Sequence, residues 1–278
     1  MSEAKPTVIV TFRDLWAGWK DAPLSNHGMN EPQALAMSLS TTCLSAIYAS
    51  PLKRALWTGQ AVRDQQPDPK PPFQESPLIR EQHFGVAEGR PWSWHQKENL
   101  SLEEHFAQGI YPVLHERHQH FPEGESVDDL FVRASRAIDE LVMPHVWRAA
   151  REGKTEVHIA LASHGLCIGE LIPALLLKDS QGVHPGDQYR GLRNTAWTRL
   201  TVEVEVTCRV TDINRHEHLD NVVRQKGGIG SAAHDPKQQD IRAFFGGGKI
   251  ANNVDLEEGR SLSNAKDEAD VVIQGTRL

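Results

Sequence analysis

The stretch from Val157 to Leu177 constrains the fold of this chain more than any other part of the sequence. An apolar run, Val157–Ala162, leads into Ser163-His164-Gly165, and a second apolar run of helical length, Leu166–Leu177, follows. Such a strand is typical of a parallel sheet that is covered on both faces. Open α/β sheets bind ligands at the carboxyl ends of their strands, beside helix amino ends that favour anions. We therefore expect His164 at the mouth of a sheet, although the triplet alone could simply start a helix.

Strand and helix patterns alternate along the rest of the chain. Further strands are expected at Thr7–Phe12, Ala46–Ser50 and Trp197–Val206, the last forming a hairpin with Arg209–Ile213. Helices are expected from about Glu31 with Pro32 in the first turn, after Pro51, after the capping pair Ser126 and Asp129, and over Leu166–Leu177 with a kink at Pro173. This order predicts an α/β fold of three layers, a mainly parallel sheet with helices on both faces.

Three segments are expected to lack regular structure. Residues 66–77 are rich in proline and are expected to form a loop. Glu81–Trp94 is dense in glycine, histidine and tryptophan, which is typical of a surface loop. After about Leu219 the sequence becomes glycine-rich, charged and polar, and it holds too little apolar surface to fold alone. We therefore predict one domain over residues 1–219 and a disordered, flexible tail over residues 220–278.

Charge and hydropathy bound the environment of the protein. The formal net charge is −7 and the sequence pI is about 6.1, which does not suggest direct binding to nucleic acid. No apolar run approaches the ~20 residues that a membrane-spanning helix needs, and the amino end does not resemble a signal peptide. We expect a soluble intracellular protein of the cytoplasm, the nucleus or both, without a membrane partner.

The candidate metal ligands in the sequence do not form a convincing pattern. The cysteines are few and lack metal-ligand spacing, which favours a reducing compartment without disulfides: Cys43, Cys167 and Cys208. His115, His118 and His120 could suggest a metal enzyme, but no cysteine or carboxylate accompanies them at ligand spacing. A solvated helix face is the expected explanation, and no metal or other cofactor is predicted.

Four separate stretches, taken in order, resemble one family. They are Asp21-Ala22-Pro23-Leu24-Ser25-Asn26-His27-Gly28, Ile47-Tyr48-Ala49-Ser50-Pro51-Leu52-Lys53-Arg54-Ala55, Glu81-Gln82-His83-Phe84-Gly85 and Leu161-Ala162-Ser163-His164-Gly165, with secondary matches at Gly124-Glu125-Ser126 and Asn194-Thr195. Together they are similar to the histidine phosphatase superfamily, whose members look like cofactor-dependent phosphoglycerate mutases. The similarity spans roughly residues 7–205.

The resemblance implies phosphoryl transfer to a histidine and then to water or another acceptor. Arg54 would grip the phosphoryl oxygens, because a planar guanidinium suits bidentate contact, and His164 would add a hydrogen bond. Glu81 would protonate the leaving oxygen and then activate water, which requires a raised pKa that burial can supply. The expected protein is a phosphatase or a mutase-like enzyme, and its partner is a phosphorylated small molecule or phosphopeptide.

One motif of the family is missing. The family carries Arg-His-Gly-Glu-Thr directly after the first strand, and that histidine is the nucleophile. Here the strand runs through Phe12 into Arg13-Asp14-Leu15, without a His-Gly pair. Arg13 could occupy the family's arginine position and bind phosphate. Removing a covalent nucleophile costs several orders of magnitude in rate. Two explanations stay open: a natural pseudoenzyme that still binds phosphate, or a segment lost through splicing or gene prediction.

The segment Gln238–Phe245 resembles a PIP box, the peptide that docks on the sliding clamp of DNA replication. Ile241, Phe244 and Phe245 would share one face of a helical turn and fill an apolar pocket. Gln238 would supply an anchoring hydrogen bond. Short motifs also arise by chance, and the phenylalanine pair could instead fold back onto the domain. The alternative function is therefore a catalytically dead phosphate-binding scaffold that is recruited to the clamp.

Overall fold

The computed structural model describes residues 7–10, 16–21, 26–93, 96–179, 181–186, 188–203 and 207–222. The chain divides into two units, residues 1–248 and residues 249–278, and the described residues all belong to the first. Most of the expected tail lies outside the described residues, so its disorder and the domain boundary at Leu219 stay predictions.

A six-stranded sheet forms the centre of the described domain. Its strands are β1 (Thr7–Val10), β2 (Leu44–Ala49), β3 (Phe73–Glu75), β4 (His158–Ala162), β5 (Ala196–Val202) and β6 (Cys208–Arg215). The spatial order is β3-β2-β4-β1-β5-β6. The first four strands in this order are parallel, whereas β5 pairs antiparallel with β1, and β6 pairs antiparallel with β5. The sheet is therefore mainly parallel, and the predicted hairpin after Trp197 is confirmed.

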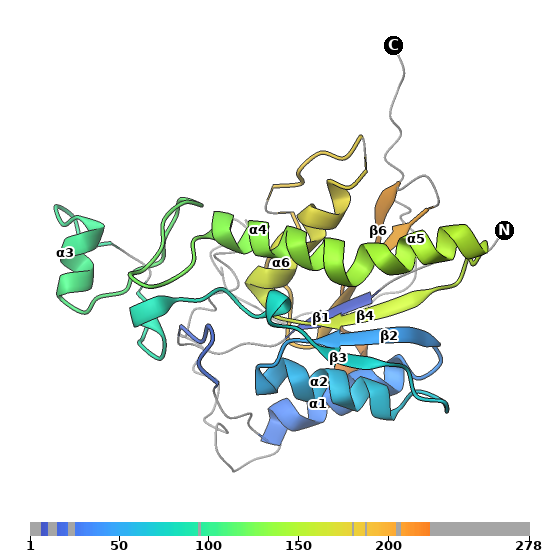
Figure 1. The fold of residues 1–278 in the computed structure, drawn as a ribbon. Helices are drawn as coiled ribbons and strands as arrows, with labels where there is room; N and C mark the ends of the chain where they lie inside the picture. Colours follow the sequence, from blue (N-terminus) through green and yellow to red (C-terminus); the bar gives the residue numbers. More distant parts are fainter. Residues whose placement is uncertain are drawn as a thin grey trace, which may run out of the picture. The chain divides into compact units, whose positions relative to one another are not determined.

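Helices cover both faces of this sheet (Figure 1). The helices over the sheet are α1 (Asn26–Ser38), α2 (Lys53–Asp64), α4 (Val127–Ala137), α5 (Met143–Glu152) and α6 (Gly165–Leu176), with a π-helical turn at Ile138–Val142 between α4 and α5. The short helix α3 (Leu102–Ala107) lies away from the sheet (Figure 1). The helices α1 and α2 lie on one face, and α4, α5 and α6 lie on the other (Figure 1). The predicted three-layer α/β fold is confirmed. Among the described helices, none is both long and apolar enough to cross a membrane.

The two layers of core follow from the alternation of side chains along the strands. Ile47 of β2 and Ala160 of β4 pack with buried residues of α1 and α2. Ala46, Ile159 and Leu161, their neighbours in sequence, pack with buried residues of α4 and α6. Strands that are buried on both faces need apolar residues at every position, which explains the continuous apolar run before His164.

The start of α4 matches the sequence pattern. The Oγ of Ser126 accepts a hydrogen bond from the N of Asp129 at 3.1 Å, and the carboxylate of Asp129 accepts one from the N of Ser126 at 3.0 Å. At the start of a helix, both main-chain N–H groups would otherwise lack a hydrogen-bond partner, so the predicted capping box is confirmed. Leu130 and Ala134 then bury the apolar face of the helix.

Proline positions were less informative than expected. The helix α1 begins at Asn26, so Pro32 lies inside it, and the prediction of a first-turn proline is wrong. The helix α6 continues past Pro173 to Leu176, as expected, and the kink expected at Pro173 stays a prediction. A proline removes one hydrogen bond from a helix. Burial of Leu35 and Ala36 in α1 offsets that loss in a way that the local sequence does not reveal.

The predicted loop over residues 66–77 contains a short edge strand. The strand β3 runs parallel to β2, and the N of Ile47 donates a hydrogen bond to the O of Pro72 at 2.9 Å. Prolines are tolerated there because an edge strand leaves one row of N–H positions without a sheet partner. The local proline content concealed the strand, because its pairing partner lies more than twenty residues away in sequence.

The described part of the expected surface loop, residues 81–93, holds only a short 3-10 helix at Gly85–Ala87, and the expectation that it lies on the surface is wrong for its first half. Glu81 and Ala87 are each 0% exposed, and Phe84 is 6% exposed. The ring of Phe84 packs against Trp16 with a centroid distance of 4.6 Å, in an aromatic cluster that also includes Phe121. Contacts between residues this far apart in sequence bury the segment, so local composition could not predict it.

Candidate active site

Three parallel strands end at the same level on one edge of the sheet. Ala49 of β2 and Ile9 of β1 both pair with Ala162 of β4. The residues that follow these strands therefore meet at this edge, and they include Ser50 and His164. A motif placed after the first strand would begin at the same edge. The topology thus brings the two strand ends that carry family-like motifs together with the end that lacks one.

Hydrogen bonds join this edge. The Nε2 of His164 lies 2.8 Å from the Oγ of Ser50, and the N of Ser50 donates to the O of Ala162 at 2.8 Å. The Oγ of Ser163 donates to the O of Ile79 at 2.8 Å. These contacts tie the ends of β2 and β4 to the segment that leads into Glu81.

His164 has no exposed surface. Burial, together with the positive charges of Arg54 and Arg133, holds the pKa of His164 well below its ordinary value. The imidazole is therefore neutral near pH 7. A neutral ring can hydrogen-bond a phosphoryl oxygen, but it does not add a positive charge to the site.

Arg54 is the buried cation of this edge. It lies in the first turn of α2, and its Nη2 donates to the O of Ala17 and to the O of Gly18, both at 2.7 Å. Its Nε and Nη1 are buried and have no hydrogen-bond partner among the described residues. Nη1 lies 4.0 Å from a carboxylate oxygen of Asp21. A guanidinium with unused buried donors is suited to a dianionic group.

Glu81 is fully buried and interacts electrostatically with Arg54. Its Oε1 accepts hydrogen bonds from the N of Gln82 at 2.9 Å and from the N of Cys167 at 3.1 Å. Its Oε2 is buried without a hydrogen-bond partner among the described residues. Burial raises the pKa of Glu81 despite the opposing hydrogen bonds and the charge of Arg54. A carboxyl group of this kind can retain a proton and donate it.

The segment Trp16–Asp21 packs against the site and is held by Glu88. The Oε1 of Glu88 accepts a hydrogen bond from the N of Trp19 at 2.6 Å, and the Nε1 of Trp19 donates to the O of Glu81 at 2.8 Å. A Cβ at Gly18 would overlap the carboxylate of Glu88, so only glycine fits there. This close packing holds main-chain carbonyl groups of the segment on the buried arginine.

The structure brings together three of the residues that the resemblance singled out. Arg54 comes from α2, Glu81 from the segment after the 3-10 helix at Pro77–Ile79, and His164 from the end of β4. All three side chains are buried, with exposed fractions of 5% for Arg54 and 0% for the other two. Arg13 lies outside the described residues, so its role in phosphate binding stays a prediction. The clamp-binding residues also lie outside them: Gln238, Ile241, Phe244 and Phe245.

Two residues that support the site were not singled out from the sequence. Glu125 belongs to the Gly-Glu-Ser signature, but no role was expected for it. Arg133 lies three residues after Leu130 and four before Ala137 on the apolar stripe of α4. A cation on the core side of a helix signals a buried partner, because a desolvated charge must be paired. This was the available sequence signal.

The histidine stretch does not form a helix face. His115, His118 and His120 are exposed and lie in an irregular segment between α3 and α4, so the helix expected there is wrong. Within the part of the chain that the structure describes, no group of three or more His, Cys, Asp or Glu residues is arranged to hold a metal ion.

Comparison with known proteins assigns the chain to a family. The model of the histidine phosphatase superfamily (branch 1) matches residues 11–214, so the chain belongs to this superfamily. It is 25% identical over 224 residues to a probable phosphatase of Schizosaccharomyces pombe, covering 81% of this chain and 71% of that protein. It is also 25% identical over 166 residues to the 2,3-bisphosphoglycerate-dependent phosphoglycerate mutase of Bartonella henselae, covering 59% of this chain and 74% of the mutase.

Solved structures show the same fold. The native structure of a mycobacterial glucosyl-3-phosphoglycerate phosphatase superposes with a TM-score of 0.57 at 22% sequence identity. The superposition covers 76% of this chain and 98% of that one. The phosphoglycerate mutase-like architecture expected from the motifs is therefore present in this chain.

Proposed function

We propose that the edge formed by Arg54, Glu81 and His164 binds the phosphoryl group of a phosphomonoester and serves phosphoryl transfer. The observation that carries this proposal is the buried guanidinium of Arg54, whose Nε and Nη1 donate no hydrogen bond among the described residues. Planar guanidinium donors match the oxygens of a dianionic phosphate. The names of the relatives, a probable phosphatase and a phosphoglycerate mutase, support the same reaction class.

Each residue of the site has its own role in the proposed phosphoryl transfer. A histidine nucleophile attacks phosphorus, the ester P–O bond breaks, and Glu81 gives its proton to the leaving oxygen. Water then attacks the phosphohistidine and gives a proton back to Glu81, which releases inorganic phosphate and the free histidine. Arg54 and His164 hold the phosphoryl oxygens through both steps. The raised pKa of Glu81 suits the first step, because the carboxyl group must start protonated.

The nucleophile is the missing part of this arrangement. No His-Gly pair follows Phe12, so we expect phosphomonoester hydrolysis by this chain to be slower than that of a complete site by several orders of magnitude. Phosphate binding depends on Arg54 and is expected to persist. The phosphatase or mutase-like activity is thus proposed for the site with its first motif in place.

A paired hydrolysis assay tests this proposal. An aryl phosphate is offered to this chain, to a variant with Arg-His-Gly-Glu-Thr inserted after Phe12, and to a matched variant with Arg-Ala-Gly-Glu-Thr inserted there. We expect activity only with the inserted histidine, together with an acid-labile phosphohistidine on that variant. Such a result supports a lost segment in an otherwise working site. Inactivity of all three chains contradicts the enzymatic proposal and favours a phosphate-binding scaffold.

The expected partner is a phosphorylated small molecule or a phosphopeptide. The roles proposed for Arg54 and His164 concern the phosphoryl group alone, so these two residues do not distinguish one phosphomonoester from another. The glucosyl-3-phosphoglycerate named for the mycobacterial phosphatase is one phosphomonoester with which to begin a substrate screen.

Recruitment to the sliding clamp is a second candidate function, and the sequence alone favours it. The spacing of Gln238, Ile241, Phe244 and Phe245 matches a PIP box, although these residues lie outside the described part of the chain. Clamp binding would place the protein in the nucleus. A titration of the Gln238–Phe245 peptide with purified clamp tests the idea, with Phe244→Ala as the control peptide. No measurable affinity at high micromolar concentration would end it.

A further inference from the structure

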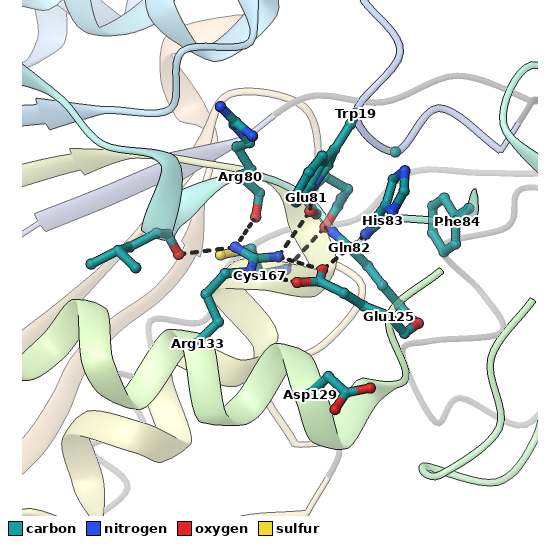
Figure 2. Close-up of polar contacts among 12 residues, drawn as sticks. Trp19, Arg80, Glu81, Gln82, His83, Phe84, Glu125, Asp129, Arg133 and Cys167 are labelled. Carbon is teal, nitrogen blue, oxygen red and sulfur yellow. Dashed lines mark hydrogen bonds and ion pairs between the residues drawn. The ribbon is translucent and has the colours of Figure 1, made fainter. Parts of the chain in front are cut away.

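Arg133 binds the main chain of the segment that carries Glu81 (Figure 2). It lies in α4, and its side chain is 14% exposed. Its Nη1 donates to the O of Leu78 and to the O of Arg80, both at 2.9 Å, and its Nη2 donates to the O of Glu81 at 3.0 Å. One half-buried guanidinium therefore bonds three carbonyl groups within four consecutive residues.

Glu125 orients Arg133 and contacts the same segment beyond Glu81. Its Oε1 accepts from the Nε of Arg133 at 2.8 Å, and its Oε2 accepts from Nη2 at 2.7 Å. The same Oε2 accepts from the N of His83 at 3.0 Å, and the O of Glu125 accepts from the Nε2 of Gln82 at 2.7 Å. The two bonds to Glu125 and the three bonds to main-chain carbonyl groups together use every N–H group of the Arg133 guanidinium. The Arg133–Glu125 pair thus bonds residues on both sides of Glu81 in sequence, Leu78 and Arg80 before it and Gln82 and His83 after it.

The position of the Glu81 carboxyl group depends on these bonds from the Arg133–Glu125 pair. Its Oε1 is anchored by the main-chain N–H groups of Gln82 and Cys167. Cys167 lies in the first turn of α6, so the carboxyl group of Glu81 is hydrogen-bonded both to its own segment and to that helix. A shift of the main chain at Gln82 would move the carboxyl group away from the phosphoryl site. Proton transfer requires placement within hydrogen-bond reach of the leaving oxygen.

We propose that Arg133, oriented by Glu125, is the positioning residue that sets the place of the Glu81 carboxyl group for proton transfer. This inference rests on the proposed function of Glu81 as the proton donor. Arg133 acts through the main chain of the Glu81 segment. A lysine at this position keeps the positive charge but has three donors on one nitrogen instead of five in a planar fork, so it cannot reproduce all the bonds that Arg133 makes to the carbonyl groups and the carboxylate.

The first test uses the chain as it exists. The carboxyl group of Glu81 is titrated by infrared difference spectroscopy, with Glu81→Gln identifying its band, in the parent chain and in Arg133→Lys. We expect the pKa of Glu81 to fall toward its ordinary range in Arg133→Lys, because the loosened segment admits water. The other charged or titratable groups facing Glu81 are Arg54 from α2 and Cys167 from α6, and neither is changed. An unchanged Glu81 titration overturns the inference.

Matched variants separate position from charge and from folding. Arg136→Lys is the control, because Arg136 lies one turn further along α4, is 68% exposed and pairs only with Glu140 among the described residues. It should leave the Glu81 titration unchanged. If Arg133→Lys fails to fold, Glu125→Gln replaces it. This isosteric change replaces one acceptor oxygen with an amide N–H₂ group, which cannot accept the hydrogen bonds that the carboxylate of Glu125 now receives. A Glu81 pKa that is unchanged in a folded Glu125→Gln variant overturns the inference as well.

The second test measures leaving-group dependence in the chain with the restored first motif. An aryl phosphate with a good leaving group needs little protonation, whereas an alkyl phosphate needs the acid. General acids contribute about 10²–10⁴ in rate, so we expect Arg133→Lys to slow the alkyl ester on the order of tenfold and the aryl ester little. An equal loss on both esters would indicate a merely structural role. If the restored chain hydrolyses neither ester, the proposed function fails, and the infrared titration then decides only whether Arg133 sets the position and surroundings of the Glu81 carboxyl group.

Discussion

At the scale of single residues, Glu81 carries the clearest physical signature in the molecule. It is a carboxyl group with no exposed surface, and burial is the largest cause of its raised pKa. The positive charge of Arg54 and hydrogen bonds from main-chain N–H groups oppose this rise but do not cancel it. Such a group favours the protonated state in the folded protein more than in the unfolded chain.

This signature predicts how stability depends on pH. The pKa of Glu81 is higher in the folded state than in the unfolded state, so its contribution to stability is present at acid pH and is lost as pH rises through the folded value. Glu81→Gln should therefore be more stable than the parent chain at neutral pH, and the difference should vanish toward acid pH. Urea unfolding at a series of pH values measures it. A difference that does not change with pH would contradict this account.

At the scale of elements, the segment after Pro77–Ile79 depends on one glycine for its path. Gly85 has a φ of 52°, and a Cβ at this position would overlap the O of Pro122. The N of Val86 donates to that same oxygen at 3.1 Å, so the segment and the turn before α4 are in direct main-chain contact. This close approach places Glu125 beside the residues that follow Glu81.

Gly85→Ala tests this contact. Both the positive φ and the overlap oppose a side chain, so we expect a loss of unfolding free energy of more than about 1 kcal/mol. Gly109→Ala is the matched control, because Gly109 has a φ of 68° but no atom within 4 Å of the added Cβ. Both variants carry the backbone strain, and denaturant unfolding should show the larger loss for Gly85→Ala. Equal losses would mean that the overlap contributes nothing.

The sequence predicted those elements whose signals are local. The capping box at Ser126 and the apolar run before His164 each lie within a few residues, and both match the structure. The burial of Glu81 and the contacts of Arg133 with Leu78 and Arg80 could not be predicted in this way. They depend on packing between segments some fifty residues apart, and composition near Glu81 indicated a surface loop.

At the scale of the whole molecule, the order of strands explains why separate motifs form one site. β4 lies between β2 and β1, and all three are parallel, so three distant segments of the chain end at one edge. The motifs at Arg54, Glu81 and His164 indicated the family, which the family model confirms. The sequence also revealed the missing His-Gly after Phe12. It did not reveal that Ala17 and Gly18 lie against Arg54, because main-chain contacts leave no pattern in side chains.

The most direct test of the account is the binding of inorganic phosphate to this chain, measured by calorimetric titration. We predict a single site at Arg54. Arg54→Gln should weaken it by about tenfold or more, since hydrogen bonds to a charged group contribute about 1.5–3 kcal/mol. Arg63→Gln, on the same helix and bonded to the O of Pro71, should leave it unchanged. Equal binding by the parent chain and Arg54→Gln, or no binding by the parent chain, would contradict the claim that this edge of the sheet is a phosphate site.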